Sequence, residues 1–330
     1  MRLLLLTLVP LAAATSLDAG SHVLGGRPFR VLLPTSPASA RAPVAILLHG
    51  LGDSGEIAEE MRELWPSLQS THIVVGPDGP DSMWNVKGEY AENTPDDALY
   101  IGKTVIDHLA TFSNVDGTSF KIVGYSNGAA LANRILIEND DPRITHILTD
   151  GSQLNTYQYR GDAFYVGGAS NQYVGTKASL TPRKVLQVVG GRDDVIPPEG
   201  GASSEIEDGE GGMLAFVPWQ ESALAIATAY GYTGAKAALS PDNPNFAKAS
   251  YLSGQVVAVN LKKVGHVAGP FEAAKAVDLA AFLAPPPSAP SPSPSPPPSP
   301  SLSPSPSPSP SPPPSPSLSP SAVPYSWCTR

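Results

Sequence analysis

The chain has 330 residues and a formal net charge of -9, and its Lys and Arg residues are scattered rather than clustered. Without a basic stripe, nucleic acids and anionic membrane surfaces are excluded as expected partners. Cys328 is the only cysteine, so no intramolecular disulfide can form and the fold must be held by its core.

The first residues have the features of a secretory signal peptide. Met1-Arg2 gives a positive start, Leu3 to Leu11 is a short apolar run, and Ala12 to Ala14 are small residues suited to cleavage. The run is too short for a membrane anchor, which needs about 20 apolar residues. The sequence therefore predicts a signal peptide over residues 1–16 and a secreted, extracellular protein.

The C-terminal part has a composition of its own. Of the 37 prolines, 20 lie between Pro285 and Pro324, where Ser-Pro repeats leave almost no apolar side chains to bury. Such a stretch adopts an extended polyproline II conformation without internal hydrogen bonds. We expect a globular domain over residues 17–284, followed by a disordered, Pro/Ser-rich low-complexity tail over residues 285–330.

Short apolar runs recur through the domain and predict β-strands. Val44 to Leu48 is a continuous run, which is typical of a strand that is buried on both faces of a parallel sheet. The other expected strands are residues 28–34, 73–75, 120–123, 144–148, 185–189 and 255–261. Helix-like segments separate several of them. The pattern therefore predicts an α/β fold with a mainly parallel central sheet and helices on both faces.

Two helices are indicated by apolar residues at helical spacing. The first is a crossover helix that begins at the acidic turn Asp96-Asp97. Its apolar residues are Ala98, Ile101, Val105, Leu109 and Phe112. The second helix contains Phe271, Ala274, Val277 and Ala281. It is expected to end at Pro285, because proline lacks an amide proton and clashes with the preceding turn.

Ser126 is the strongest candidate for a catalytic residue. It lies in Gly124-Tyr125-Ser126-Asn127-Gly128, between the apolar run 120–123 and the helix-like stretch 129–138. In a nucleophile elbow, a Gly-x-Ser-x-Gly turn exposes the Ser hydroxyl at the carboxyl end of a central strand, and the small flanking residues permit the tight turn. A simple glycine-rich turn without a catalytic role is the alternative.

A second glycine-rich turn, His49 to Gly55, directly follows the expected strand at 44–48. Such a turn can aim a backbone N–H group at a developing oxyanion, and Leu51 is the candidate donor. The second donor would be the amide of Asn127, the residue after the nucleophile, at the start of a helix. The alternative is an ordinary strand end that happens to be rich in glycine.

A nucleophilic Ser needs a base that takes its proton and a carboxylate that orients the base. The strand at 185–189 leads into a tight acidic turn with Asp193 and Asp194, and the residues alone leave either of them as the acid. His266 is the expected base, because it follows the last expected strand and is the only histidine after the acidic turn. The chain order is then Ser, Asp, His.

These motifs resemble those of secreted α/β-hydrolase esterases, in the family of polyhydroxybutyrate-depolymerase-like, feruloyl and acetylxylan esterases. The similarity covers residues 27–283. It rests on His49-Gly50, Pro77-Asp78-Gly79 with Trp84-Asn85, Asp96-Asp97, Tyr125 to Gly128, Gly190 to Asp193 with Val195-Ile196-Pro197, and Gly265-His266 with Pro270. In the family pattern the acid stands four residues before the proline of a Val-Pro or Ile-Pro pair. The resemblance therefore selects Asp193.

The chain also departs from the family pattern. Gly190 follows Val189 where many relatives have His-Gly, the loop after His266 lacks the usual Trp before Pro270, and the cysteine pairs of many members are missing. The resemblance implies that Trp84 binds substrate at the mouth of the site, where its indole could stack on a sugar or an aromatic acid, whereas core filling is the alternative. The tail resembles the hydroxyproline-rich modules of plant and algal cell-wall proteins.

Together these features predict a secreted serine esterase that acts on carboxylic esters of the polyester, feruloyl or acetyl-polysaccharide type. Ser126, Asp193 and His266 would form the triad and the amides of Leu51 and Asn127 the oxyanion hole, so that neither a metal nor a cofactor is required. The expected partner is an ester substrate, with cell-wall polysaccharide among the candidates. A non-catalytic cell-wall or adhesive protein on a hydrolase scaffold is the alternative, and a serine peptidase is a third possibility.

Overall fold

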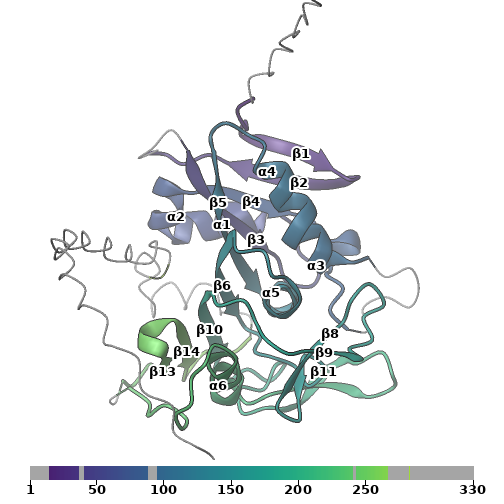
Figure 1. Cartoon of the computed structure of the whole chain (residues 1–330), viewed down its shortest axis with the longest axis vertical. Helices are drawn as coiled ribbons and strands as arrows, with labels where there is room; N and C mark the ends of the chain where they lie inside the picture. The colour runs from purple at the N-terminus through teal and green to yellow at the C-terminus, as the bar shows by residue number, and fades with distance from the viewer. Residues whose placement is uncertain (1–14, 37–40, 88–94, 241–242, 267–281, 283–330) are drawn as a thin grey trace, which may run out of the picture. The chain divides into compact units, whose positions relative to one another are not determined.

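The computed structural model describes residues 15–36, 41–87, 95–240, 243–266 and 282 (Figure 1). Three predicted features lie outside this part of the chain: all but the last two residues of the signal peptide, the helix expected before Pro285 except for Phe282, and the tail. They remain predictions, as does the domain boundary at Ala284. Within the described residues, no helix is both long enough and apolar enough to cross a bilayer.

A nine-stranded sheet forms the centre of the fold. Its strands in spatial order are β1 (Gly20–Leu24), β2 (Arg27–Leu32), β4 (Ile73–Pro77), β3 (Ala42–Leu48), β5 (Val115–Tyr125), β6 (Ile144–Asp150), β10 (Lys184–Gly190), β14 (Val256–Leu261) and β13 (Phe246–Tyr251). The six central strands run parallel to one another: β4, β3, β5, β6, β10 and β14. At the two edges, β1 pairs with β2, β2 with β4, and β13 with β14, all in the antiparallel direction. The predicted mainly parallel sheet is confirmed.

Helices cover both faces of this sheet, as the alternation of strand and helix predicted (Figure 1). Alternate residues of β3 face opposite sides, with Val44 and Ile46 in one hydrophobic cluster and Ala45 and Leu47 in another. The first cluster includes side chains of α3 (Asp97–Leu99), η2 (Tyr100–Val105), α4 (Ile106–Leu109), α5 (Asn127–Glu138) and α6 (Trp219–Ala229). The second cluster includes those of α1 (Ile57–Leu64) and α2 (Pro66–Thr71).

The expected crossover helix is present as the continuous stretch α3, η2 and α4. Its first turn is capped by Asp96, whose side chain accepts a hydrogen bond from the Leu99 amide at 3.0 Å. This cap satisfies one of the amides that a helix start leaves without a partner inside the helix. The middle segment η2 is a π-helix, which the apolar spacing did not predict.

Two small sheets interrupt the alternation and were not predicted. One consists of β7 (Tyr159–Arg160), β8 (Ala163–Val166) and β9 (Gly175–Lys177) and is inserted between β6 and β10. The other is the hairpin of β11 (Gly201–Glu207) and β12 (Met213–Phe216), between β10 and α6. Two short 3-10 turns, η1 (Pro80–Ser82) and η3 (Leu252–Gly254), complete the described elements.

The register of the parallel strands brings their carboxyl ends to one edge of the sheet. Leu48 at the end of β3 pairs with Gly124 of β5, and Tyr125 pairs with Asp150 at the end of β6. On the far side, Gly190 of β10 pairs with Leu261 of β14. The segments that follow these strands carry all the candidate catalytic residues, so the topology places them at a common edge.

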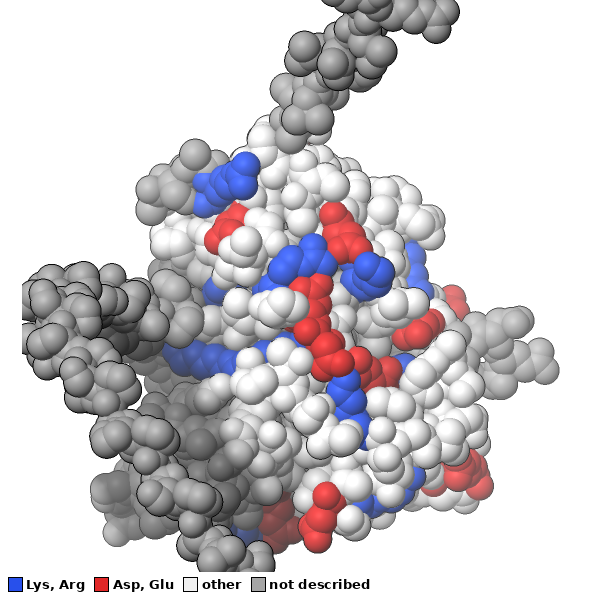
Figure 2. Space-filling model, viewed as in Figure 1, with Lys and Arg blue, Asp and Glu red and all other residues white. Residues whose placement is uncertain are grey.

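The surface charges agree with the scattered distribution seen in the sequence. On the face drawn in Figure 2, basic and acidic side chains interleave and do not form a basic stripe. Two ion pairs share one carboxylate: Asp107 contacts Lys103 at 2.8 Å and Arg143 at 2.5 Å. Exposed pairs of this kind add little stability, about 0–1 kcal/mol each.

Candidate active site

Ser126 occupies the tight turn between β5 and α5. Its backbone has φ 52° and ψ -115°, a strained conformation that costs a non-glycine residue about 1–3 kcal/mol. A Cβ atom on Gly124 would lie 2.2 Å from the carbonyl oxygen of Gly128, and one on Gly128 would lie 2.2 Å from that of Leu48. Only glycine fits at either position, so the turn has the geometry of a nucleophile elbow.

The structure brings Ser126, His266 and Asp193 into contact. Ser126 Oγ lies 2.8 Å from His266 Nε2, and His266 Nδ1 lies 2.7 Å from Asp193 Oδ2. Both are hydrogen-bond distances. When Nδ1 carries the proton and donates to the carboxylate, Nε2 is left as an acceptor for the proton of the Ser126 hydroxyl. The arrangement can therefore activate a serine for nucleophilic attack.

The turn after β10 orients the Asp193 carboxylate. Its Oδ1 atom accepts hydrogen bonds from the amides of Val195 at 3.0 Å and Ile196 at 2.7 Å, which leaves Oδ2 for His266. Asp194 is exposed, and its main-chain carbonyl accepts a hydrogen bond from the Ser204 hydroxyl at 2.7 Å. Of the two aspartates that the residues alone left open, Asp193 is the one that contacts His266.

Tyr125 holds His266 from the elbow itself. Its hydroxyl donates to the main-chain carbonyl of His266 at 2.8 Å, and the two rings stack with their centroids 5.8 Å apart. Burial raises the pKa of Tyr125 to about 12, and the nearby carboxylates of Asp150 and Asp193 add to the shift, so the phenol remains a donor. This role could not be predicted from the motif, because Tyr125 stands at an unspecified position of Gly-x-Ser-x-Gly.

Leu51 and Asn127, the expected oxyanion donors, both line the pocket beside Ser126. The Asn127 side chain forms two hydrogen bonds with the main chain of Trp84: the Trp84 amide donates to Oδ1 at 2.6 Å, and Nδ2 donates to the Trp84 carbonyl at 3.1 Å. The turn at Leu51 is held by a hydrogen bond from the Gly52 amide to the Ser82 carbonyl at 2.8 Å. These bonds fix both donor segments, and the oxyanion role stays a prediction.

The prediction that Trp84 binds substrate needs correction. Its side chain is 0% exposed and does not line the pocket. The indole Nε1 donates to the carbonyl of His49 at 3.0 Å, and the ring lies 4.8 Å from the His49 ring. Because both contacts are inside the core, no face of the indole is open to a ligand. Trp84 instead fills the core and supports the turn after β3, an orientation that its position in the sequence could not reveal.

His49 is a buried structural residue of the same turn. The Gly79 amide donates to its Nε2 atom at 2.9 Å, so Nε2 is unprotonated and Nδ1 donates to the Gly50 carbonyl at 2.7 Å. Burial lowers the pKa of His49, which agrees with a neutral ring. A neutral His49 adds no charge beside the oxyanion donors.

A cavity of about 430 Å³ lies against Ser126 and His266. Its apolar wall includes Val86, Val195, Ile196, Ile206, Leu214 and Phe216. Three of these side chains, Ile196, Leu214 and Phe216, form a hydrophobic cluster distinct from the two clusters on the sheet. A larger cavity of about 750 Å³ lies between α6 and β8 and contains none of the three contacting residues, so the chemistry identifies the smaller cavity as the candidate site.

Comparisons with known proteins agree with this architecture. No family model matches the chain. Putative esterase NocK of Nocardia uniformis subsp. tsuyamanensis is 29% identical over 139 residues, a match that covers 40% of this chain and 40% of that protein. Acetyl xylan esterase from Aspergillus awamori is 13% identical with a TM-score of 0.50, over 78% of this chain and 94% of the other. The chain has the α/β-hydrolase fold.

The carboxylesterase of Bacillus cereus is another similar structure, with 15% identity and a TM-score of 0.45 over 78% of this chain and 95% of the other. Identities this low indicate the fold alone. The chain spans less than half of the curated relative that it matches.

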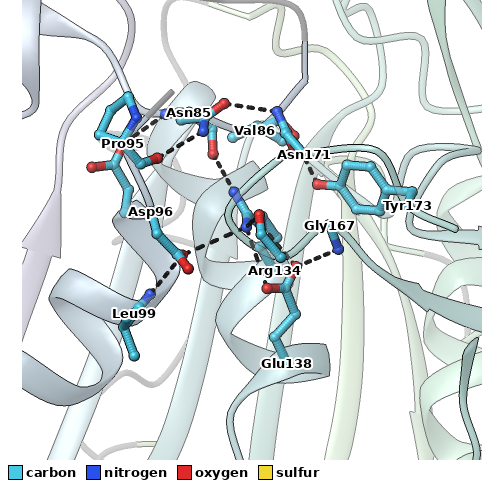
Figure 3. A network of polar contacts seen from close by, with 12 residues as sticks. Asn85, Val86, Pro95, Asp96, Leu99, Arg134, Glu138, Gly167, Asn171 and Tyr173 are labelled. Carbon is cyan, nitrogen blue, oxygen red and sulfur yellow. Dashed lines mark hydrogen bonds and ion pairs between the residues drawn. The ribbon is translucent and has the colours of Figure 1, made fainter. Parts of the chain in front are cut away.

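A buried arginine on α5 ties the helix of the elbow to its surroundings (Figure 3). Arg134 is 0% exposed and donates to the carbonyls of Asn85 and Gly168, both at 2.7 Å. It also donates to Glu138 Oε1 at 2.8 Å and lies 3.7 Å from an oxygen of Asp96. Two carboxylates and two carbonyls therefore surround one guanidinium, which uses its fixed array of donors.

The same network fixes the loop that carries the pocket residue Val86. Tyr173 donates to the Val86 carbonyl at 2.8 Å, and Asn171 donates to the side chain of Asn85 at 2.7 Å (Figure 3). Because the main chain of Trp84 in turn holds Asn127, the network connects α5 to both the wall of the pocket and the oxyanion side. The sequence offered no signal for Arg134, which stands on a helix face without a motif.

We expect Arg134→Met to lower the free energy of unfolding by about 3–5 kcal/mol, because it removes the guanidinium from the buried carbonyl of Asn85 and from the carboxylate of Glu138, which keeps the Gly167 amide as a donor but loses its cation. Urea denaturation of the purified protein measures this change. Arg30→Met is the matched control, since the Arg30 side chain is 37% exposed and pairs with the exposed Glu56 and Glu59. Its expected cost is at most about 1 kcal/mol. Similar losses in the two variants would contradict a structural role for the network.

Proposed function

We propose that this chain is a secreted serine esterase that hydrolyses carboxylic esters through an acyl-enzyme intermediate. The observation that carries the proposal is the pair of contacts that link Ser126 Oγ to His266 Nε2 at 2.8 Å and His266 Nδ1 to Asp193 Oδ2 at 2.7 Å. A serine, a base and an orienting carboxylate at these spacings form the machinery of acyl transfer.

In the proposed reaction, His266 takes the hydroxyl proton while Ser126 Oγ attacks the ester carbonyl carbon. The carbonyl oxygen becomes an oxyanion, which the amides of Leu51 and Asn127 stabilise. His266, now charged, is stabilised by Asp193 and gives the proton to the departing alcohol. Water then attacks the acyl-enzyme in the same way, with His266 as base, and releases the acid.

The names of the similar proteins support an ester substrate at the level of class. NocK is a putative esterase, and the structure with a TM-score of 0.50 is an acetyl xylan esterase. Secretion is proposed from the N-terminal residues 1–16, and a wall-directed spacer role from the Ser-Pro composition of residues 285–330. The candidate substrates are therefore short acyl esters, including those of wall polysaccharides.

A fluorophosphonate probe tests the activated serine, since it reacts only with a serine whose hydroxyl has been activated. Wild-type protein is expected to be labelled and Ser126→Ala to remain unlabelled. Ser170→Ala is the control, because Ser170 is exposed and lies outside the pocket, and it should be labelled like the wild type. Labelling of Ser126→Ala would show that another residue reacts, and an unlabelled wild type would favour a non-catalytic scaffold.

A substrate panel identifies the ester class in the same preparation. It contains p-nitrophenyl esters of increasing acyl length, methyl ferulate, acetylated xylan and polyhydroxybutyrate. We expect hydrolysis of the short acyl esters. Cleavage of amide substrates at rates comparable to those of esters would instead indicate a peptidase.

A further inference from the structure

The β11–β12 hairpin forms one side of the candidate active site. It begins at Gly201, and the φ angles of Gly200 and Gly201 are 81° and 100°. It supplies Ile206, Leu214 and Phe216 to the pocket. Leu214 and Phe216 are each 3% exposed and pack on Ile196. A substrate held at Ser126 would therefore place an apolar group against side chains of the hairpin.

The charged side chains of the same pocket are all acidic. Apart from His266 and Tyr125, the titratable lining residues are Asp53 and Glu205, both exposed at the surface. Among the described residues that line the pocket, none is Lys or Arg. A charged group of a substrate thus meets two carboxylates and, among the described lining residues, no compensating Lys or Arg.

Lys87 is next in the chain to the lining residue Val86, and its charge is paired with a carboxylate of the hairpin. Lys87, which follows the lining residue Val86, is 5% exposed and donates to Glu210 Oε1 at 2.6 Å. Its ammonium also lies 4.4 Å from the centre of the Tyr157 ring. Tyr157 in turn donates to Asp208 Oδ2 at 3.0 Å, so the tip of the hairpin is tied to the body of the domain.

We propose that the β11–β12 hairpin determines substrate specificity by accepting an apolar group against Leu214 and Phe216 and by favouring neutral or cationic esters over anionic ones through Glu205. The proposal rests on the proposed esterase function. An anionic ester loses hydration in the pocket and gains no ion pair there, so it is penalised relative to a neutral ester of the same shape. A cationic ester gains the attraction instead.

Three butyrate esters of similar shape separate charge from size. Their alcohols are choline, which is cationic, 3,3-dimethylbutanol, which is neutral, and 2-hydroxyethanesulfonate, which is anionic. The measured quantity is kcat/KM for each ester, in wild type and in Glu205→Gln. Intrinsic differences in reactivity between the esters cancel when the ratio of cationic to anionic rates is compared between the two proteins.

Glu205→Gln is expected to lower the cationic-to-anionic ratio about tenfold, because the Glu205 carboxylate attracts the cationic ester and repels the anionic one by about threefold each. The rate with the neutral ester, which carries no charge for Glu205 to attract or repel, should change less than the rate with either charged ester. In wild type the ratio should also fall as salt is raised from about 0.05 to 0.5 M, because salt screens exposed charges.

Glu207→Gln is the matched control. It removes the same charge from the same strand, but Glu207 is exposed and does not line the pocket. The cationic-to-anionic ratio of kcat/KM in Glu207→Gln should stay within about twofold of the wild-type value. Equal ratios in Glu205→Gln and wild type, with the neutral ester still hydrolysed, would overturn the role of the hairpin charge. Failure of wild type to hydrolyse the neutral ester would overturn the esterase function itself.

The apolar side of the proposal has a separate readout. Leu214→Ala should raise the ratio of kcat/KM for p-nitrophenyl octanoate over butyrate by about three- to ten-fold. Removal of the Leu214 methyl groups enlarges the space in the pocket that is open to the acyl chain. An unchanged ratio in a variant that hydrolyses butyrate at the wild-type rate would show that the acyl group does not reach the hairpin.

Discussion

Replacement of Asp193 by Asn is expected to lower kcat by about four orders of magnitude, whereas Asp194→Asn should lower it by less than about twofold. The amides of Val195 and Ile196 both donate to Oδ1 of Asp193. In the variant they would hold the side-chain carbonyl oxygen at that position, which turns the NH₂ group toward His266. His266 Nδ1 must then accept a hydrogen bond, so the ring proton moves to Nε2.

With its proton on Nε2, His266 can no longer accept the proton of Ser126, and the loss of the carboxylate removes the stabilisation of the charged imidazole. Steady-state hydrolysis of a p-nitrophenyl ester measures the loss in kcat. Circular dichroism of both variants checks that they fold. A larger loss in Asp194→Asn than in Asp193→Asn would mean that the contact with Asp193 does not exist in solution.

Much of the central sheet could be predicted because its strands are buried on both faces. A run such as Val44 to Leu48 has no polar residue, and this pattern is readable without knowledge of the neighbours. The antiparallel β13 and the hairpin strands are different. The burial of β11 alternates irregularly along Gly201–Glu207, with a shift in its register against β12, so no clean period of two marks it as a strand.

In the candidate site too, some features could be predicted from local sequence patterns, whereas others depend on contacts between residues distant in the sequence. The contacts of Ser126, Asp193 and His266 follow from strand ends that a parallel sheet must bring together, so chain order could anticipate a serine, an aspartate of the acidic turn and a histidine. The choice of Asp193 over Asp194 needed the family resemblance. The burial of Trp84 depends on its packing against His49, 35 residues away, and was predicted wrongly. Tyr125 and the hairpin side chains belong to the site through contacts with residues distant in the sequence, which no local motif predicts.

Asp150 is a buried carboxyl group that the proposed mechanism does not use. It ends β6, is 0% exposed, and its main-chain carbonyl accepts a hydrogen bond from the Ser126 amide at 2.8 Å. Among the described residues, neither of its carboxylate oxygens has a hydrogen-bond partner. Burial, together with the charge of Asp193, raises the pKa of Asp150 from 3.8 to about 8. The folded protein therefore keeps Asp150 protonated at pH values where the unfolded chain has released the proton.

Because the folded state holds this proton more tightly, stability falls as the pH rises from about 4 to about 8, and the loss is complete above the folded pKa. The full shift corresponds to a loss of at most about 5–6 kcal/mol, at 1.36 kcal/mol per pH unit. Asp150→Asn cannot titrate. We therefore expect the free energy of unfolding of the variant, relative to wild type, to increase by several kcal/mol between pH 4.5 and pH 8.5.

Urea denaturation of both proteins across this pH range measures the difference. Other titrating groups cancel in it: burial lowers the pKa of His72 to about 4, which costs stability as the pH falls, but this cost is common to both proteins. Asp194→Asn is the control, because its exposed carboxylate should leave the pH curve parallel to that of wild type. A pH-independent difference between Asp150→Asn and wild type would show that Asp150 is ionised in the folded protein throughout the range, and a second charge would then stand beside Asp193.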